Sequence, residues 1–86
     1  MRAGIIADDF TGATDIASFL ANNGIDTCLF SGIPDEDYHG EARALVISLK
    51  SRSIPAEESV TLSLNALRWL QQQQCDRFYF KYCSTF

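Results

Sequence analysis

Two adjacent carboxylates, Asp8 and Asp9, follow a short apolar run and precede Thr11 and Gly12. An apolar run that ends in polar residues is typical of a strand leading into a helix, and helix amino termini attract anions. Because Gly12 has no side chain, a ligand can approach the backbone closely there. One aspartate is enough to cap a helix, whereas two neighbouring ones repel each other. The pair therefore indicates a binding pocket that also contains positive charge.

Candidate cations follow two later hydrophobic runs. Arg52 comes shortly after the run at 44–48, and Lys81 lies near the end of an aromatic run, with Ser84 and Thr85 beyond it. A guanidinium can hold a carboxylate through two parallel hydrogen bonds, while carboxylates accept hydrogen bonds from neighbouring hydroxyl groups. Together these residue types predict a site for a small polyhydroxylated acid, in which one aspartate could take a proton from a reacting hydroxyl.

The strands that must carry these residues are indicated by hydrophobic patterning. Short, unbroken apolar runs suit strands that are covered on both faces, as in a parallel sheet. The last run is aromatic and also suits a strand. The predicted strands are residues 3–7, 26–30, 44–48 and 77–82.

Two helices are expected between these strands. Apolar residues spaced as on one helix face run from Ala13 to Ala21, and Gly24 suits the position just after that helix. The second helix is expected from about Pro55, which suits a first turn, to about Gln74, with the glutamines at its end in solvent. Its apolar residues are Val60, Leu64 and Leu67 on one stripe, with Leu62, Ala66 and Trp69 or Leu70 beside it.

The order of elements is therefore β-α-β-β-α-β, which predicts an α/β fold with a parallel-type sheet and helices on both faces. Ligands of such sheets bind beyond the carboxyl ends of the strands. We therefore expect the acidic and basic residues that follow three of the strands to meet at one edge of the sheet.

Size, charge and cysteine usage exclude several kinds of protein. The 86 residues suffice for one small domain, and a net charge of −4 without clustered Lys and Arg argues against a nucleic-acid surface. The three cysteines lack CxxC spacing and suit reduced thiols in a cytoplasmic protein. No apolar run is long enough for a membrane span. His39 has no neighbouring ligands at metal-binding spacing, so no metal site is expected.

Three stretches together resemble the four-carbon acid sugar kinases. They are ADDFTGATD near the start, a Ser-x-x-Ser-Arg turn from Ser48 to Arg52, and KYCSTF at the end. The resemblance covers essentially all of the chain, and it is closest to the 3-oxo-tetronate kinases. It implies ATP-dependent phosphorylation of an acid such as 3-oxo-tetronate, threonate or erythronate.

The resemblance also implies a larger, two-domain protein. Residues 1–86 would be an incomplete amino-terminal α/β domain that binds the sugar acid. ATP and Mg²⁺ would be bound mainly by a carboxy-terminal domain that is absent from this chain. The expected partners are the small-molecule sugar acid and ATP, without nucleic acid or membrane, and a homo-oligomer is allowed.

The resemblance places eight residues at the sugar-acid site, with Asp9 as the candidate proton acceptor and no dedicated metal ligands. These residues are Asp8, Asp9, Thr11, Gly12, Arg52, Lys81, Ser84 and Thr85.

Two other functions stay open from the sequence. A receiver-like signalling module also has paired acids after its first strand, but it needs a phosphate-accepting Asp after the third strand. The residues there are Ser48, Leu49 and Lys50, which argues against it. A non-catalytic fragment that binds a sugar acid is the second alternative.

Overall fold

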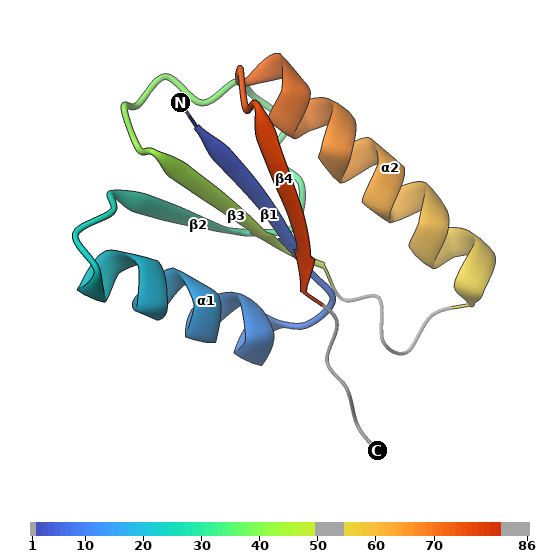
Figure 1. Cartoon of the computed structure of the whole chain (residues 1–86). Helices are drawn as coiled ribbons and strands as arrows, with labels where there is room; N and C mark the ends of the chain where they lie inside the picture. Colours follow the sequence, from blue (N-terminus) through green and yellow to red (C-terminus); the bar gives the residue numbers. More distant parts are fainter. Residues whose placement is uncertain (1, 50–54, 82–86) are drawn as a thin grey trace.

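The computed structural model describes residues 2–49 and 55–81, which form a parallel sheet of four strands with a helix on each face (Figure 1). The predicted α/β fold is therefore confirmed. The strands lie side by side in the order β2-β3-β1-β4. Their bounds are β1 Ala3–Ala7, β2 Thr27–Ser31, β3 Ala44–Ser48 and β4 Arg77–Lys81, and the helices are α1 Phe10–Asn22 and α2 Ala56–Gln72.

Alternating side chains divide the core between the two faces of the sheet. In β1, Ile5 packs with Val46 of β3 against the α1 side, where Ala13 is fully buried. The next residue, Ile6, packs on the opposite face in a cluster that contains Leu70 of α2. Both faces of β1 and β3 are thus covered, which explains why these strands are uninterrupted apolar runs.

Both helices end in the same left-handed turn. Gly24 follows α1 with a φ of +79°, as predicted, and the N–H of Ile25 donates to the carbonyl of Leu20. Gln74 takes the corresponding position after α2 with a φ of 67° and places the N–H of Cys75 on the carbonyl of Leu70. The predicted second helix was therefore two residues too long, because a left-handed residue cannot continue a helix. Because glutamine is not typical of this left-handed position, the sequence did not predict the turn.

Helix α2 approaches β1 closely, and this contact determines which face of the helix is buried. A Cβ on Gly4 would lie 2.8 Å from Cδ1 of Leu70, so only glycine leaves room for the helix. The buried face is centred on Ala66 and Leu70, and the expected stripe of Val60 and Leu64 is 59% and 50% exposed instead. Helical spacing alone did not distinguish these two neighbouring faces.

Arg2 and Gln73 tie the chain together at the amino end of the sheet. The Arg2 guanidinium donates to three carbonyl groups, those of Gly40, Ala42 and Gln73, at 2.8–2.9 Å. Gln73 is only 4% exposed, and its side-chain carbonyl accepts from the N–H of Tyr38 at 2.8 Å. The expectation that the glutamines form a solvated helix end was therefore wrong for Gln73.

Candidate functional site

The chain leaves β1 and β3, two neighbouring strands, toward opposite faces of the sheet. Helix α1 follows β1 on one face, and α2, the next described element after β3, lies on the other (Figure 1). The two strands end level with each other, since Ala7 pairs with Ser48 and the N–H of Leu49 donates to the carbonyl of Ala7 at 2.8 Å. In open parallel sheets, ligands bind in the crevice that opens at such a reversal. The carboxyl rim of β1 and β3 is therefore the place to look for a site.

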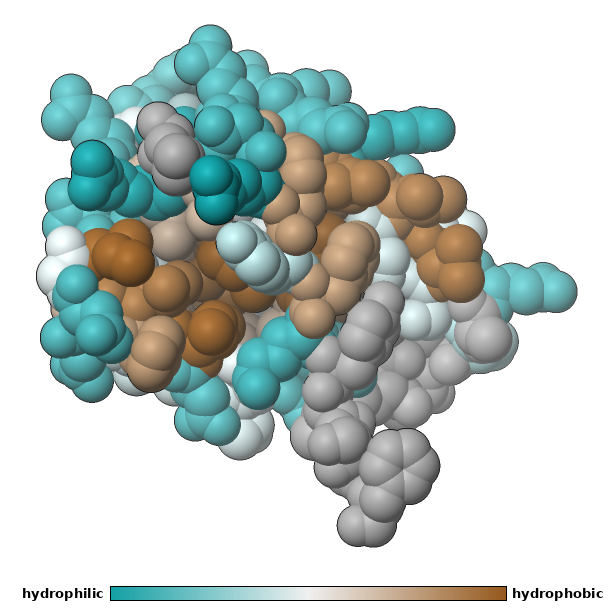
Figure 2. All heavy atoms as spheres, viewed as in Figure 1, coloured by the Kyte–Doolittle hydropathy of each residue, from teal (hydrophilic) through white to brown (hydrophobic). Residues whose placement is uncertain are grey.

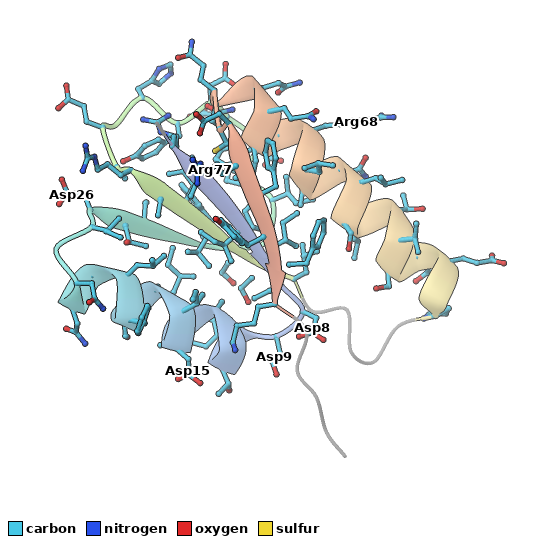
Figure 3. All side chains as sticks on the ribbon, viewed as in Figure 1. Asp8, Asp9, Asp15, Asp26, Arg68 and Arg77 are labelled. Atoms are coloured by element: carbon cyan, nitrogen blue, oxygen red, sulfur yellow. The ribbon has the colours of Figure 1, made fainter. Side chains whose placement is uncertain are left out.

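Asp8 and Asp9 lie on this rim, directly after β1 (Figure 3). The backbone of Asp9 is extended, with a φ of −148° and a ψ of 167°, and its Oδ1 accepts from the N–H of Gly12 at 2.6 Å. Asp9 is thus the amino-terminal cap of α1. The backbone N–H of Asp8 instead donates to the carbonyl of Lys81 at 3.2 Å, so β4 reaches the rim beside β1. Both aspartates are half-buried.

Lys81 comes from the far end of the chain and lies against the start of α1. Its Cε and Cδ lie 3.7 and 3.9 Å from the position that a Cβ on Gly12 would take. A helix amino terminus carries partial positive charge, and on its own it disfavours a nearby cation. The carboxylates of Asp8 and Asp9 supply the opposite charge at this rim. The arrangement combines acids, a cation and a helix amino terminus in one small region.

The structure thus brings together Asp8, Asp9, Gly12 and Lys81, which belong to three different segments. Thr11 lies next to Gly12 in the first turn of α1 and is exposed. Three other predicted site residues, Arg52, Ser84 and Thr85, lie outside the described residues. The part of each residue in binding a ligand stays a prediction.

Three further features of the described residues bear on the functions considered. The residues that follow the middle of β3 are Ser48 and Leu49, both at most 3% exposed, so the described part of this strand end carries no phosphate-accepting aspartate. Within residues 2–49 and 55–81, no three His, Cys, Asp or Glu side chains are grouped to hold a metal ion. Neither α1 nor α2 is both long and apolar enough to cross a bilayer.

A groove formed by the described residues was not anticipated from the sequence. It lies between α1 and β4, has a volume near 790 Å³, and includes Lys81 in its lining. Arg77 and Tyr79 of β4 also line it. Only the position of β4 at the sheet edge, which the sequence does not reveal, exposes them.

Comparisons with known proteins give one family model and several named relatives. Residues 3–86 match the family model described as "Sugar-binding N-terminal domain". A protein of Pectobacterium atrosepticum named 3-oxo-tetronate kinase is 64% identical over the whole chain, which covers 20% of that relative. A protein of Escherichia coli with the same name is 58% identical over the whole chain, covering 22% of its length.

A solved structure shows the same fold in a longer protein. A crystal structure of a Haemophilus influenzae protein superimposes with a TM-score of 0.92 at 55% identity, covering 96% of this chain and 20% of that one. The chain therefore spans about a fifth of the length of the relatives it matches.

Proposed function

Because the chain belongs to the family of sugar-binding N-terminal domains, we propose that it binds the substrate of an ATP-dependent sugar-acid kinase. The substrate is a four-carbon acid of the 3-oxo-tetronate, threonate or erythronate type. One observation carries the proposal: Lys81 and the Asp8–Asp9 pair meet at the carboxyl rim of the sheet. Such a rim offers a positive group for the carboxylate of the acid and negative groups for its hydroxyls.

Each rim residue has a role in this proposal. Lys81 and Arg52 hold the carboxylate of the acid, and Asp8 accepts hydrogen bonds from its hydroxyl groups. Asp9 is the candidate acceptor of the proton from the reacting hydroxyl, in addition to capping α1. The Gly12 backbone allows close approach of the ligand. The hydroxyl-bearing residues that complete the site are Thr11, Ser84 and Thr85.

Phosphoryl transfer also needs a nucleotide and a metal ion. In this proposal, residues 1–86 are an incomplete acid-binding domain, and a further domain of a longer protein binds ATP and Mg²⁺. The metal would supply charge neutralisation for phosphoryl transfer. The residues of this chain contribute by fixing the acid with one hydroxyl toward the phosphate, since positioning supplies much of the rate in such reactions. Free thiols at Cys28 and Cys75 suit a reducing compartment such as the cytoplasm.

The experiment places this chain in a complete kinase. In a chimera, the segment of the Pectobacterium relative that matches this chain is replaced by the chain itself, which is 64% identical to it. We expect ATP-dependent phosphorylation of at least one of 3-oxo-tetronate, threonate and erythronate, measured as ADP release. Erythritol, which has the hydroxyls but no carboxylate, is the control substrate and should be at least ten times poorer.

The result that contradicts the proposal is equally direct. A folded chimera that phosphorylates none of the three acids would rule it out, provided that the unmodified relative is active in the same assay. Equal activity on erythritol would show that the cationic part of the site does not recognise a carboxylate.

A further inference from the structure

Strand β4 is an edge of the sheet, but it lacks the protection that edge strands usually have. It pairs only with β1 among the described strands, and its Tyr79 and Phe80 are 54% and 43% exposed. An exposed strand edge offers unpaired backbone groups, and proteins normally cover or charge it. Parallel sheets in particular are covered on both faces. Among the described residues, strand β4 is therefore an exposed edge that a further polypeptide segment can cover.

The groove between α1 and β4 lies beside this exposed edge, on the face of the sheet that carries α1. Helix α1 packs over β1, β2 and β3. Of β4, Lys81 meets the first turn of α1, while Arg77 and Tyr79, which lie on the same face, are exposed. The floor of the groove is apolar, formed by Ile5 of β1 with Ile16 and Leu20 of α1. Figure 2 shows these hydrophobic side chains as a hollow between the polar rims. The volume, near 790 Å³, is well beyond a packing defect.

The charged side chains that line the groove are all positive. Arg43, Arg77 and Lys81 line it, and none of the described residues that line it is acidic. Arg43 and Arg77 are both exposed. An occupant that matches this lining has an apolar stripe flanked by acidic side chains, which is the pattern of an amphipathic helix.

We propose that this groove docks an amphipathic helix with acidic flanks, supplied by the remainder of a longer polypeptide of this family. The relatives that match this chain are about five times as long, so each has ample further sequence to supply such a helix. A helix laid in the groove covers the exposed face of β4 in the way that α1 covers its neighbours. This inference concerns assembly. Because Lys81 belongs both to the groove and to the proposed sugar-acid site, the test uses Arg77 and Tyr79 instead.

A second copy of this chain fits the groove less well. Pairing two grooves about a two-fold axis would bring Arg43, Arg77 and Lys81 of both copies together, and like charges in contact cost free energy. A helix from the rest of a longer chain has no such restriction.

The test supplies the proposed partner as a separate polypeptide. The 86-residue chain, carrying an affinity tag, is expressed together with the remaining four-fifths of the Pectobacterium relative. We expect the two to purify at one to one. The variants Arg77→Glu and Tyr79→Asp should lower the recovered partner at least tenfold. The matched controls Arg68→Glu on α2 and Phe19→Asp on α1 change exposed residues outside the groove and should recover as much partner as the original chain.

Hydrogen exchange gives a second readout in the same complex. Amides of residues 77–81 should exchange at least ten times more slowly in the complex than in the chain alone. Because Arg77 is exposed, its variant tests the proposal even if Tyr79→Asp fails to fold, which far-UV circular dichroism reports.

Three results would overturn the proposal. They are no recovery of partner by the original chain, equal recovery by groove and control variants, and a dimer of the chain alone that Tyr79→Asp abolishes. The last would make a second copy the occupant. None of these measurements uses a sugar acid or ATP, so their failure is distinct from failure of the proposed function.

Discussion

Lys81 and Gly12 lie far apart in the sequence, yet the Cε of Lys81 is 3.7 Å from the position that a Cβ on Gly12 would occupy. The same Cβ would lie 2.9 Å from Oδ1 of Asp9, which caps the helix. The absence of a side chain at residue 12 thus accommodates the Asp9 cap, while the lysine stem lies at ordinary contact distance from the same position. Acid and cation therefore share the start of one helix.

Removing the Lys81 charge should weaken binding of the acid. Lys81→Met keeps a long apolar stem beside Gly12 but loses the ammonium, so the Michaelis constant of the chimera for its sugar acid should rise about 10- to 100-fold. Arg68→Met removes an exposed cation from α2 and serves as the control, with an unchanged constant. Equal behaviour of the two variants in steady-state kinetics would remove Lys81 from the site.

The two roles proposed for Asp9 can be separated by two substitutions. Asn is also a good helix cap, so Asp9→Asn should keep the melting temperature of the chimera while kcat falls about 100-fold or more. Asp9→Ala should lower kcat similarly and also cost about 1 kcal/mol of stability. If Asp9→Asn retains full kcat, Asp9 is a cap only, and Asp8→Asn becomes the variant to examine.

A single substitution at Gln74 should stabilise the domain. Gln74 has a φ of 67°, in the left-handed region that costs a residue with a side chain about 1–2 kcal/mol. Gln74→Gly should therefore raise the free energy of unfolding by about 1 kcal/mol, less some loss from the more flexible unfolded chain, as measured by urea denaturation. The same change three residues earlier, Gln71→Gly, lies inside α2 and should destabilise by about 1 kcal/mol. Equal signs for the two variants would contradict this explanation.

The Cys75 thiol should make stability fall at alkaline pH. Burial raises the pKa of this thiol from 9.0 to about 11, with the charge of Arg2 opposing the shift. Between about pH 9 and pH 11 the unfolded chain releases this proton while the folded one retains it, so unfolding becomes more favourable as the pH rises. Cys75→Ala removes this component, and its stability should fall less steeply over that window in urea denaturation. Parallel curves for the two proteins would show that the thiol does not contribute.

The fold could be predicted from the sequence where the local residue pattern and the tertiary environment agree. Continuous apolar runs identified β1 and β3 because both faces of each strand are buried. The strand order could not be predicted, since no local sequence pattern places β3 between β1 and β2 or β4 at the edge. The burial of Gln73 also escaped notice, because its partners come from the distant loop around Tyr38.

The candidate site could be predicted from the sequence to a similar degree. Residue types at strand ends predicted that Asp9 and Lys81 would meet at one rim, because carboxyl ends of parallel strands share an edge. Sequence spacing could not say which aspartate caps the helix, since that depends on the extended backbone of Asp9. The groove beside Tyr79 was missed for the same reason as the strand order.

Arg2 holds three carbonyl groups at the end of the sheet opposite to the acidic rim. These hydrogen bonds, which connect distant segments of the domain, are therefore remote from the proposed sugar-acid site. Substitutions at the carboxyl rim should therefore leave the Arg2 hydrogen bonds intact, so that stability and ligand binding can be altered separately.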